Sequence, residues 1–347
     1  MLNTMTLGRL RLAVQLLMLF LTVWGSQVVG YYAAEKISGT LPALSCAYDK
    51  QNGAYCMLIP LQHQLHHRVG EGLVAAQQFS FQILLPLLFT LLTFLAFFVV
   101  LNKAFCGWVC PLGTLQELVF RLGRRLGLPV RRLEAGQAAK ARPVKWLLLV
   151  ILVLALPLMA GLGLTPHSTG DAWCQVCPSR IATTLLTADT EQTALKTDST
   201  LEFALGAVAN TLLGFTLVAA LALRQPFCRI CPLLAWNALF QKIGLLRLVK
   251  RQHDKCGKCR VCSEACPMDI EAISQAHGSK AFTEDCTLCG RCAEYCPEDG
   301  VIALKFGPLA LFRSSRAYYK RRVQGEKPNG ETRPVQSRVK FVEPGHG

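Results

Sequence analysis

Apolar residues gather in four long runs along the first two thirds of the chain, at 12–30, 79–101, 146–164 and 201–223. Each run has about the 20 residues that an α-helix needs to cross a hydrocarbon core of roughly 30 Å. The last three runs contain no ionisable residue except Glu202 at the start of the fourth. The first run follows Arg9 and Arg11 and lacks a clear small-x-small cleavage site, so we expect a retained anchor helix. The pattern predicts four transmembrane helices.

The segments between these runs differ in charge. Segment 103–145 holds nine Lys or Arg against two Glu, whereas segment 165–200 holds two Lys or Arg against four acidic residues. Because basic loops stay in the cytoplasm, we expect both termini and 103–145 inside, with 31–78 and 165–200 outside, in a multi-pass protein of a bacterial inner membrane. The formal charge of +15 lies in loops beside apolar runs. It therefore predicts contact with anionic membrane lipid and no nucleic acid.

Two cysteine runs near the carboxyl end share the spacing C-x2-C-x2-C-x3-C-P. This spacing is typical of bacterial ferredoxins with two [4Fe–4S] clusters, in which the fourth cysteine of each run binds the other cluster. Zinc sites and disulfides are the alternatives, but two complete runs with eight ligands in all fit a four-ligand zinc site badly. The ligands predicted for the first cluster are Cys256, Cys259, Cys262 and Cys296. Those predicted for the second are Cys286, Cys289, Cys292 and Cys266.

The other eight cysteines form four pairs that repeat with the apolar runs. The pairs that follow the second and fourth runs are Cys106, Cys110, Cys228 and Cys231. The pairs that precede the same runs are Cys46, Cys56, Cys174 and Cys177. The second cysteines of corresponding pairs are separated by 121 positions, which predicts a duplicated two-helix unit. Such a unit brings the first four thiols together at the inner face, where we expect a further [4Fe–4S] cluster; unliganded thiols are the alternative.

The outer four cysteines, Cys46, Cys56, Cys174 and Cys177, allow three interpretations. They can form disulfides in an oxidising compartment, the C-x-x-C pair can be redox-active, or all four can hold a metal. Nearby, His63 and His67 are four residues apart and share a helix face. They could bind metal or a quinol head group, although a solvated polar patch is the simpler interpretation. We expect the inner and outer cysteines to be separated by about the bilayer thickness, roughly 30 Å, with a quinone moving between them.

These features together resemble the NapH/MauN-type membrane iron–sulfur proteins. The motifs that carry the resemblance are F-C-G-W-V-C-P-L-G at 105–113, F-C-R-I-C-P at 227–232 and the two ferredoxin runs. The resemblance covers about residues 80–300 and implies a polyferredoxin-like quinol dehydrogenase subunit of a periplasmic respiratory enzyme. The second motif has two residues between its cysteines where the family usually has three. The resemblance implies no role for the outer cysteines.

We therefore expect a membrane α-helical protein with four transmembrane helices, arranged as a duplicated two-helix unit, and a carboxyl-terminal α+β ferredoxin domain. The predicted divisions are two transmembrane repeats, the ferredoxin domain and a basic disordered tail, at 1–130, 131–250, 251–305 and 306–347. The expected function is electron exchange between the quinol pool and a periplasmic or membrane redox partner. Two alternatives stay open. One is an accessory factor that reduces a metal or a thiol for the maturation of another metalloenzyme, and the other is a redox sensor.

Overall fold

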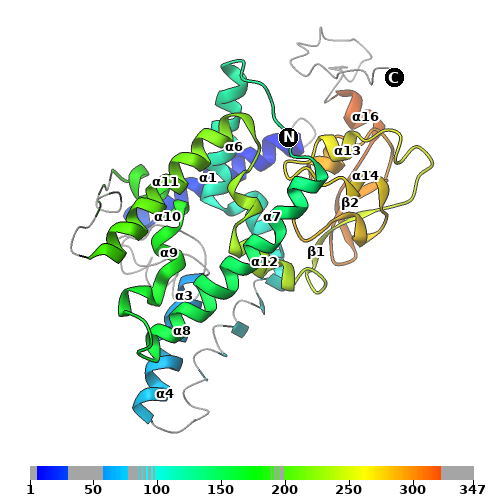
Figure 1. The fold of residues 1–347 in the computed structure, drawn as a ribbon. Helices are drawn as coiled ribbons and strands as arrows, with labels where there is room; N and C mark the ends of the chain where they lie inside the picture. Colours follow the sequence, from blue (N-terminus) through cyan, green and yellow to red (C-terminus); the bar gives the residue numbers. More distant parts are fainter. Residues whose placement is uncertain are drawn as a thin grey trace.

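A helical part and a smaller part with a three-stranded sheet lie side by side in the computed structural model (Figure 1). The structure describes residues 6–29, 58–76, 98–188 and 199–321, with a few single positions between 85 and 96 and between 190 and 195. The cysteine pair at 46 and 56 lies outside the described residues. The smaller part contains both ferredoxin runs, so we call it the ferredoxin part.

Three helices among the described residues are long and apolar enough to cross a membrane. They are α1 (Leu7–Val29), α11 (Thr200–Ala222) and a continuous helix made of α7 (Ala135–Leu148), the π-helix η4 (Leu149–Ala155) and α8 (Leu156–Gly161). They correspond to the first, third and fourth predicted runs. The second run, 79–101, lies mostly outside the described residues. The fourth span and the duplicated four-helix arrangement therefore stay predictions.

Shorter helices complete the helical part. They are α3 (Leu58–His63), η2 (Gln64–Gly70), α4 (Glu71–Ala76), η3 (Phe105–Val109), α6 (Pro111–Arg125), η5 (His167–Asp171), α9 (Ala172–Val176), α10 (Pro178–Leu186), η7 (Phe227–Arg229) and α12 (Pro232–Leu239). Three of them, α6, α10 and α12, begin with a proline directly after a cysteine. Proline suits the first helical position because its missing amide hydrogen would have no partner there.

The helix that contains the third run begins at Ala135, well before the predicted start at 146. Its basic first half lies against the ferredoxin part. The Nζ of the fully buried Lys145 is 2.5 Å from Asp285 Oδ1 and 3.1 Å from Glu284 Oε1, and Arg142 Nε is 2.6 Å from Asp285 Oδ2. These ion pairs compensate the burial of the charges. These ion pairs explain why the helix begins before its apolar run.

Segment 165–186, predicted as an outer loop, folds back among the helices. Helices α9 and α10 in this segment pack against α11, and α10 also packs against α6. Trp173 and Cys174 are only 2% and 3% exposed. Burial of apolar surface stabilises by roughly 25 cal/mol per Å², so the apolar side chains of this segment favour the interior over the surface. Loop charge alone did not indicate this return.

Helices α6 and α11 approach closely at Gly123, where a Cβ atom would lie 2.0 Å from Leu221 O. We expect Gly123→Ala to lower the free energy of unfolding by about 1–3 kcal/mol, because the backbones must separate. The matched control is Gly214→Ala in α11, where no described atom lies within 4 Å of the added Cβ. That change should be neutral or stabilising by up to about 1 kcal/mol. Thermal unfolding in detergent, followed by circular dichroism, measures the stability of both variants. Equal melting temperatures of the two variants would contradict the close contact at Gly123.

The ferredoxin part contains one antiparallel sheet with strand order β1-β2-β3. The strands are β1 (Leu246–Lys250), β2 (Ile302–Phe306) and β3 (Leu309–Arg313). Between β1 and β2 lie the cysteine runs and the short helices α13 (Val261–Glu264), α14 (Ala272–Gln275), η8 (Ser279–Ala281) and α15 (Arg291–Glu294). The sheet thus extends on both sides of the predicted division 251–305. Strand β3 and helix α16 (Arg316–Tyr319) fall in the range predicted as a tail, of which 322–347 lie outside the described residues.

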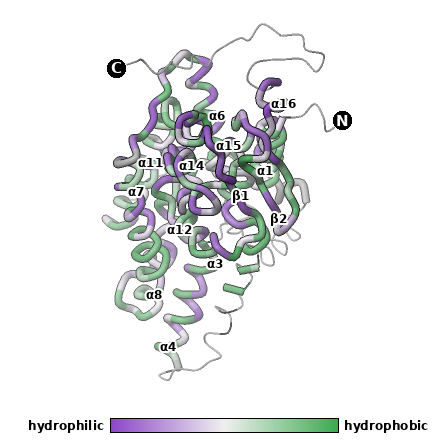
Figure 2. Tube along the Cα trace, turned by 90° about the vertical axis from the view of Figure 1, so that its right-hand side faces the viewer, coloured by the Kyte–Doolittle hydropathy of each residue, from purple (hydrophilic) through white to green (hydrophobic). Residues whose placement is uncertain are grey.

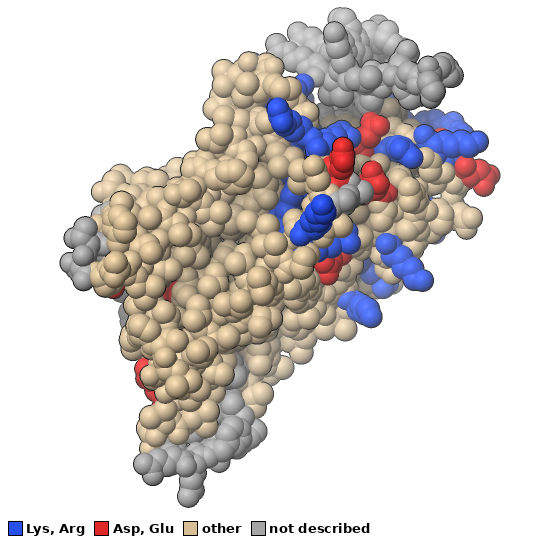
Figure 3. All heavy atoms as spheres, viewed as in Figure 1, with Lys and Arg blue, Asp and Glu red and all other residues tan. Residues whose placement is uncertain are grey.

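Charged and apolar side chains occupy different regions of the surface. In the view of Figure 3, Lys and Arg gather over the ferredoxin part and the adjoining end of the helical part. Apolar residues predominate along α8 (Figure 2), and on the helices Leu147, Phe215 and Val218 are 58%, 68% and 69% exposed. Large apolar side chains in contact with solvent are unusual for a soluble protein, and lipid is the environment that suits them.

Candidate iron–sulfur sites

One cavity of the ferredoxin part is lined by thiols from both cysteine runs. These are Cys256, Cys259, Cys262 and Cys296. Burial raises the pKa of Cys262 to about 11, against the opposing charge of Lys250 and with the thiol of Cys296 adding to the rise. The Cys262 thiol therefore does not ionise by itself near neutral pH, whereas binding to iron releases its proton. The donor set and its enclosure fit a [4Fe–4S] cluster.

A second group of four thiols lies deeper in the ferredoxin part. Its members, all buried, are Cys266, Cys286, Cys289 and Cys292. Burial raises the pKa of Cys266, and the thiols of Cys289 and Cys286 raise it further. Burial and the other three thiols of the group likewise raise the pKa of Cys292. The structure therefore brings the fourth cysteine of the first run to the second run, and this set also fits a [4Fe–4S] cluster.

The backbone of each run explains why its cysteines converge. Arg260 and Gly290 have left-handed conformations, with φ of 48° and 75°, directly before the one-turn helices α13 and α15. Leu288 is also left-handed, with φ of 49°. A left-handed residue reverses the chain within a few positions, so three cysteines spaced three apart can point to one centre. Glycine adopts this conformation without strain, and the other two residues do so at a cost.

A third group of thiols comes from two similar turns of the helical part. Its members are Cys106, Cys110, Cys228 and Cys231. Cys106 lies in η3 and Cys228 in η7, and each turn ends at a cysteine that precedes the proline of α6 or α12. Burial raises the pKa of Cys106, and the thiols of Cys110 and Cys228 raise it further. The two turns thus lie together, and their four thiols fit one more [4Fe–4S] cluster.

Two buried amides donate hydrogen bonds to these sulfurs. Asn237 Nδ2 is 3.2 Å from Cys106 Sγ, and Gln116 Nε2 is 3.7 Å from Cys228 Sγ. The oxygen of Gln116 accepts from Phe227 N at 3.1 Å, which fixes the orientation of the amide. Hydrogen bonds to cluster sulfurs stabilise the reduced state and raise the reduction potential. Neither amide was predicted, because a single amide within a helix does not by itself indicate a contact with sulfur.

The third group is in direct contact with the second through its loop. Trp108 Nε1 donates to Leu288 O at 3.0 Å. A Cβ atom at Gly107 would lie 2.4 Å from Thr287 O and 3.2 Å from Cys289 Cα. Glycine is therefore needed at position 107 for the two cysteine loops to approach this closely.

Lys103 places a positive charge between the second and third groups. Its side chain is buried, and Nζ donates to Gln241 Oε1 at 2.8 Å and to two backbone oxygens of the ferredoxin part at 3.0 and 3.2 Å. Burial lowers the pKa of Lys103 to about 8, while the thiols of Cys286 and Cys106 oppose this shift. A buried cation near both groups favours thiolates and negatively charged clusters.

The helical part contains a further internal repeat, of 54 positions. Gln62 Oε1 accepts from Trp173 N at 3.2 Å, and Gln62 Nε2 donates to Cys174 Sγ at 3.2 Å. Gln116, which stands 54 positions after Gln62, makes the same two bonds with Phe227 and Cys228. In both copies the two partners follow the glutamine by 111 and 112 positions. The pair at 174 and 177 therefore has the same local surroundings as the pair at 228 and 231.

The inner and outer cysteines are much closer than we expected. The rings of Trp173 and Phe227, which directly precede Cys174 and Cys228, stack with centroids 6.1 Å apart. Burial raises the pKa of Cys231, and the thiol of Cys177 is the next cause. The predicted separation of roughly 30 Å is wrong for this pair of segments. The return of 165–186 into the helical part is the physical reason.

The structure describes half of the outer cysteines and both predicted histidines. Cys174 and Cys177 form no disulfide with each other. The other two outer cysteines, at 46 and 56, lie outside the described residues. A disulfide between those two, and a metal site shared by all four, therefore stay predictions. The rings of His63 and His67 lie 5.2 Å apart between centroids. Burial lowers the pKa of His63, and the charge of His67 adds to this effect.

Two family models match the chain in three places. A model described as a 4Fe-4S binding domain matches residues 83–129 and again 205–251, and these ranges contain the two cysteine pairs of the third group. A model described as a 4Fe-4S dicluster domain matches residues 248–297, which contain both ferredoxin runs. Both matches support iron–sulfur clusters as cofactors of this chain.

Curated relatives share these parts at modest identity. The regulatory protein NosR of Pseudomonas aeruginosa is 31% identical over 67% of this chain and 28% of its own length. An uncharacterized protein of Methanocaldococcus jannaschii is 28% identical over 58% of this chain and 72% of its own length. The ferredoxin-type protein NapH of Escherichia coli is 24% identical over 57% of this chain and 60% of its own length. The chain thus spans less than two thirds of NosR and NapH, and no solved structure matches it. The family models and relatives together support a NapH-like polyferredoxin family with iron–sulfur binding domains for this chain, at modest identity.

Proposed function

We propose that the chain exchanges electrons between the quinol pool and a periplasmic or membrane redox partner through three [4Fe–4S] clusters. The observation that carries this proposal is the contact of Gly107 and Trp108 with the loop of the second ferredoxin site. This contact joins the cysteines of the helical part and those of the ferredoxin part into one continuous series. A quinol in the membrane would then be within reach of one end of the series.

The residues around the thiols position the clusters and set their potentials. When bound, the clusters would supply one-electron transfer. The amides of Gln116 and Asn237 donate to sulfurs of the third site, and Lys103 adds a positive charge between the second and third sites. All three interactions favour the more negative, reduced state. Burial of Cys106 and Cys228 limits the access of water to their sulfurs.

Cys174 and Cys177 extend this series toward the other side of the membrane. Gln62 gives Cys174 the same amide contact that Gln116 gives Cys228, and Trp173 stacks on Phe227. We infer a metal-binding role for this pair, by analogy with the pair at 228 and 231. Electrons would then have a protein route toward a partner outside, in addition to a diffusing quinone.

The orientation proposed from loop charge is consistent with the surface. Lys and Arg gather at the ferredoxin end of the view in Figure 3. Basic residues favour the cytoplasmic side and contact with anionic lipid. We therefore propose a bacterial inner-membrane protein with the ferredoxin part and both termini in the cytoplasm.

Anaerobic reaction with a short-chain quinone tests the proposal. We expect reduced protein in lipid vesicles to be re-oxidised, forming one quinol for every two electrons released and taking up two protons from water. The Cys106→Ser/Cys228→Ser variant should keep its ferredoxin clusters yet react at least about tenfold more slowly, because the third site belongs to the helical part that we place in the membrane. Rapid-mixing absorbance at the cluster bands measures both rates. Equal rates in the two proteins would exclude the third site from the route.

An accessory role is the second candidate. The relative NosR is named a regulatory protein, and Cys174 and Cys177 form a C-x-x-C pair that could reduce a metal ion or a disulfide of another protein. The Cys174→Ser/Cys177→Ser variant separates the two functions. Loss of Cu²⁺ or disulfide reduction with an unchanged quinone reaction would favour the accessory role.

A further inference from the structure

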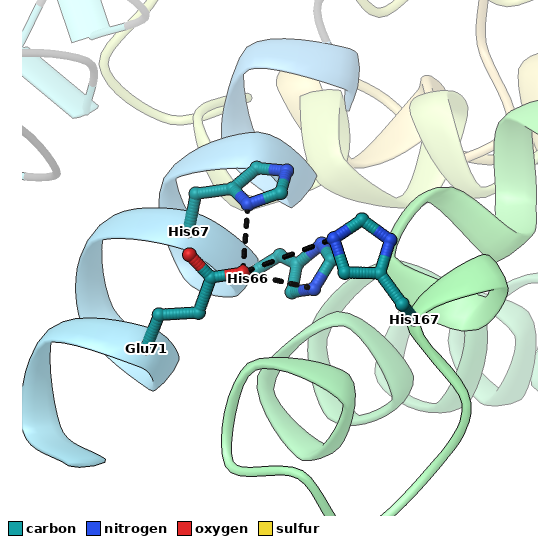
Figure 4. A group of neighbouring side chains, drawn as sticks. All are labelled: His66, His67, Glu71 and His167. Atoms are coloured by element: carbon teal, nitrogen blue, oxygen red, sulfur yellow. Dashed lines mark hydrogen bonds and ion pairs between the residues drawn. The ribbon is translucent and has the colours of Figure 1, made fainter. Parts of the chain in front are cut away.

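Four side chains converge near α4 and α8, at the end of the helical part away from the ferredoxin part (Figure 1). They are His66, His67, Glu71 and His167. Each contributes one nitrogen or oxygen atom, and these atoms all lie within 4.8 Å of one another. Figure 4 shows the three imidazole rings and the carboxylate turned toward one another from η2, α4 and η5.

The carboxylate of Glu71 faces all three rings. Its Oε1 is 2.9 Å from His67 Nδ1, 3.6 Å from His66 Nε2 and 3.9 Å from His167 Nε2. Only the first distance is a hydrogen bond. Donor atoms that each lie about 2.0–2.2 Å from one metal ion are roughly 3–4 Å apart, and these separations are of that size.

His66 is held in a position built for its ring. The residue is 3% exposed, and its Nε2 has no hydrogen-bond partner among the residues that the structure describes. Buried polar atoms normally have a partner, so this nitrogen indicates a ligand. A Cβ atom at Gly170 would lie 2.0 Å from His66 Nδ1, and one at Gly161 would lie 2.2 Å from His66 O. Two glycines thus make room for this histidine.

The local helix geometry is unusual at the same residues. His66 and His67 lie in the π-helix η2, a type of turn found frequently at functional sites. Neighbouring residues of a helix normally point in different directions. Here their rings stack with centroids 4.0 Å apart, and the ring of His167 lies 4.4 Å from that of His66. The fold therefore assembles the three imidazoles from two separate segments.

We propose that His66, His67, Glu71 and His167 bind a divalent transition-metal ion of the zinc or copper class. Imidazole nitrogens with one carboxylate oxygen suit these ions, whereas calcium and magnesium favour oxygen ligands and iron–sulfur clusters favour thiolates. The side chains of Glu71 and His167 are 46% and 76% exposed, so the ion enters from solvent. The site is separate from the thiol groups.

Zn²⁺ binding to the cluster-loaded protein in lipid nanodiscs tests this site. Anaerobic competition with a chromophoric chelator should show one ion per chain, with the iron content measured in parallel to exclude displacement from the thiols. His167→Ala should weaken binding at least about tenfold, and its exposure makes misfolding a poor explanation. His63→Ala is the matched control and should bind as the wild type does. Cu²⁺ in place of Zn²⁺ should give an EPR spectrum with nitrogen hyperfine lines from the imidazoles.

The outcomes separate this site from other uses of the histidines. Equal affinity of wild type and His167→Ala overturns the proposal, as does weakening by His63→Ala alone. Absence of one-to-one binding by the wild type also overturns it and leaves a hydrogen-bonded histidine patch. Binding of Cu²⁺ with much weaker binding of Zn²⁺ supports the site and assigns it to copper.

Discussion

Replacing Cys106 and Cys228 together by serine should remove about four iron and about four sulfide from each chain, leaving about eight iron in the two ferredoxin sites. The two residues come from different turns, and each is 8% exposed. Each sulfur accepts a hydrogen bond from a buried amide, so a serine oxygen would meet a site shaped for sulfur. Anaerobic iron and sulfide analysis measures the loss, and EPR of the reduced protein identifies the missing cluster.

A matched double variant, Cys256→Ser/Cys259→Ser, provides the control. It should lose the same amount of iron but a different EPR signal, because it removes two thiols that line the cavity of the first ferredoxin site. If the Cys106→Ser/Cys228→Ser variant retains all its iron, the third group does not hold a cluster. The helical part would then act through thiols, another metal or docking of a partner.

The ferredoxin sites could be anticipated from the sequence because their geometry is largely local. Three cysteines at intervals of three, followed by a fourth and a proline, restrict the backbone to a tight turn and a short helix. The structure has this form, with Gly290 in a left-handed conformation before α15. The apolar runs likewise predicted helices, because twenty apolar residues leave few alternatives.

The relation between the two membrane-side cysteine groups could not be read from charge or hydropathy. Loop charge indicates a side of the membrane, but it does not show that Trp173 would be buried against Phe227. That contact depends on tertiary packing of α9 and α10. One signal was present in the sequence: Gln62 and Gln116 each stand six positions after a cysteine, in the same order relative to their C-x-x-C partners. Only the structure shows why that spacing matters.

The helix limits differ from the apolar runs for a similar reason. Arg11 was placed before the first run, yet it lies within α1 and is 4% exposed. Its guanidinium donates to Cys289 O at 3.1 Å and lies 3.9 Å from Glu117. A buried charge is stable where such partners exist. Hydropathy alone does not reveal those partners, so it starts the helix too late.

Lys103→Met should lower the reduction potential of the second or third cluster on the order of 90 mV, because a unit charge at about 8 Å is worth about 2 kcal/mol at an effective dielectric constant of 20. Lys103 is 1% exposed and lies beside Cys286 and Cys106. Methionine has a similar length and no charge, so the change removes the electrostatic effect with little loss of packing. EPR-monitored redox titration gives the potential of each cluster.

Lys250→Met is the matched control for this prediction. Lys250 is 2% exposed, donates to Ile273 O and Ser274 O at 2.5 and 3.0 Å, and lies beside Cys262 of the first site. Its replacement should therefore shift the first cluster and leave the others nearly unchanged. Because both lysines lose comparable hydrogen bonds, a general loosening of the fold would affect all clusters in both variants. If each variant shifts the potential of a different cluster and leaves the others unchanged, then each buried cation sets the potential of its own neighbours.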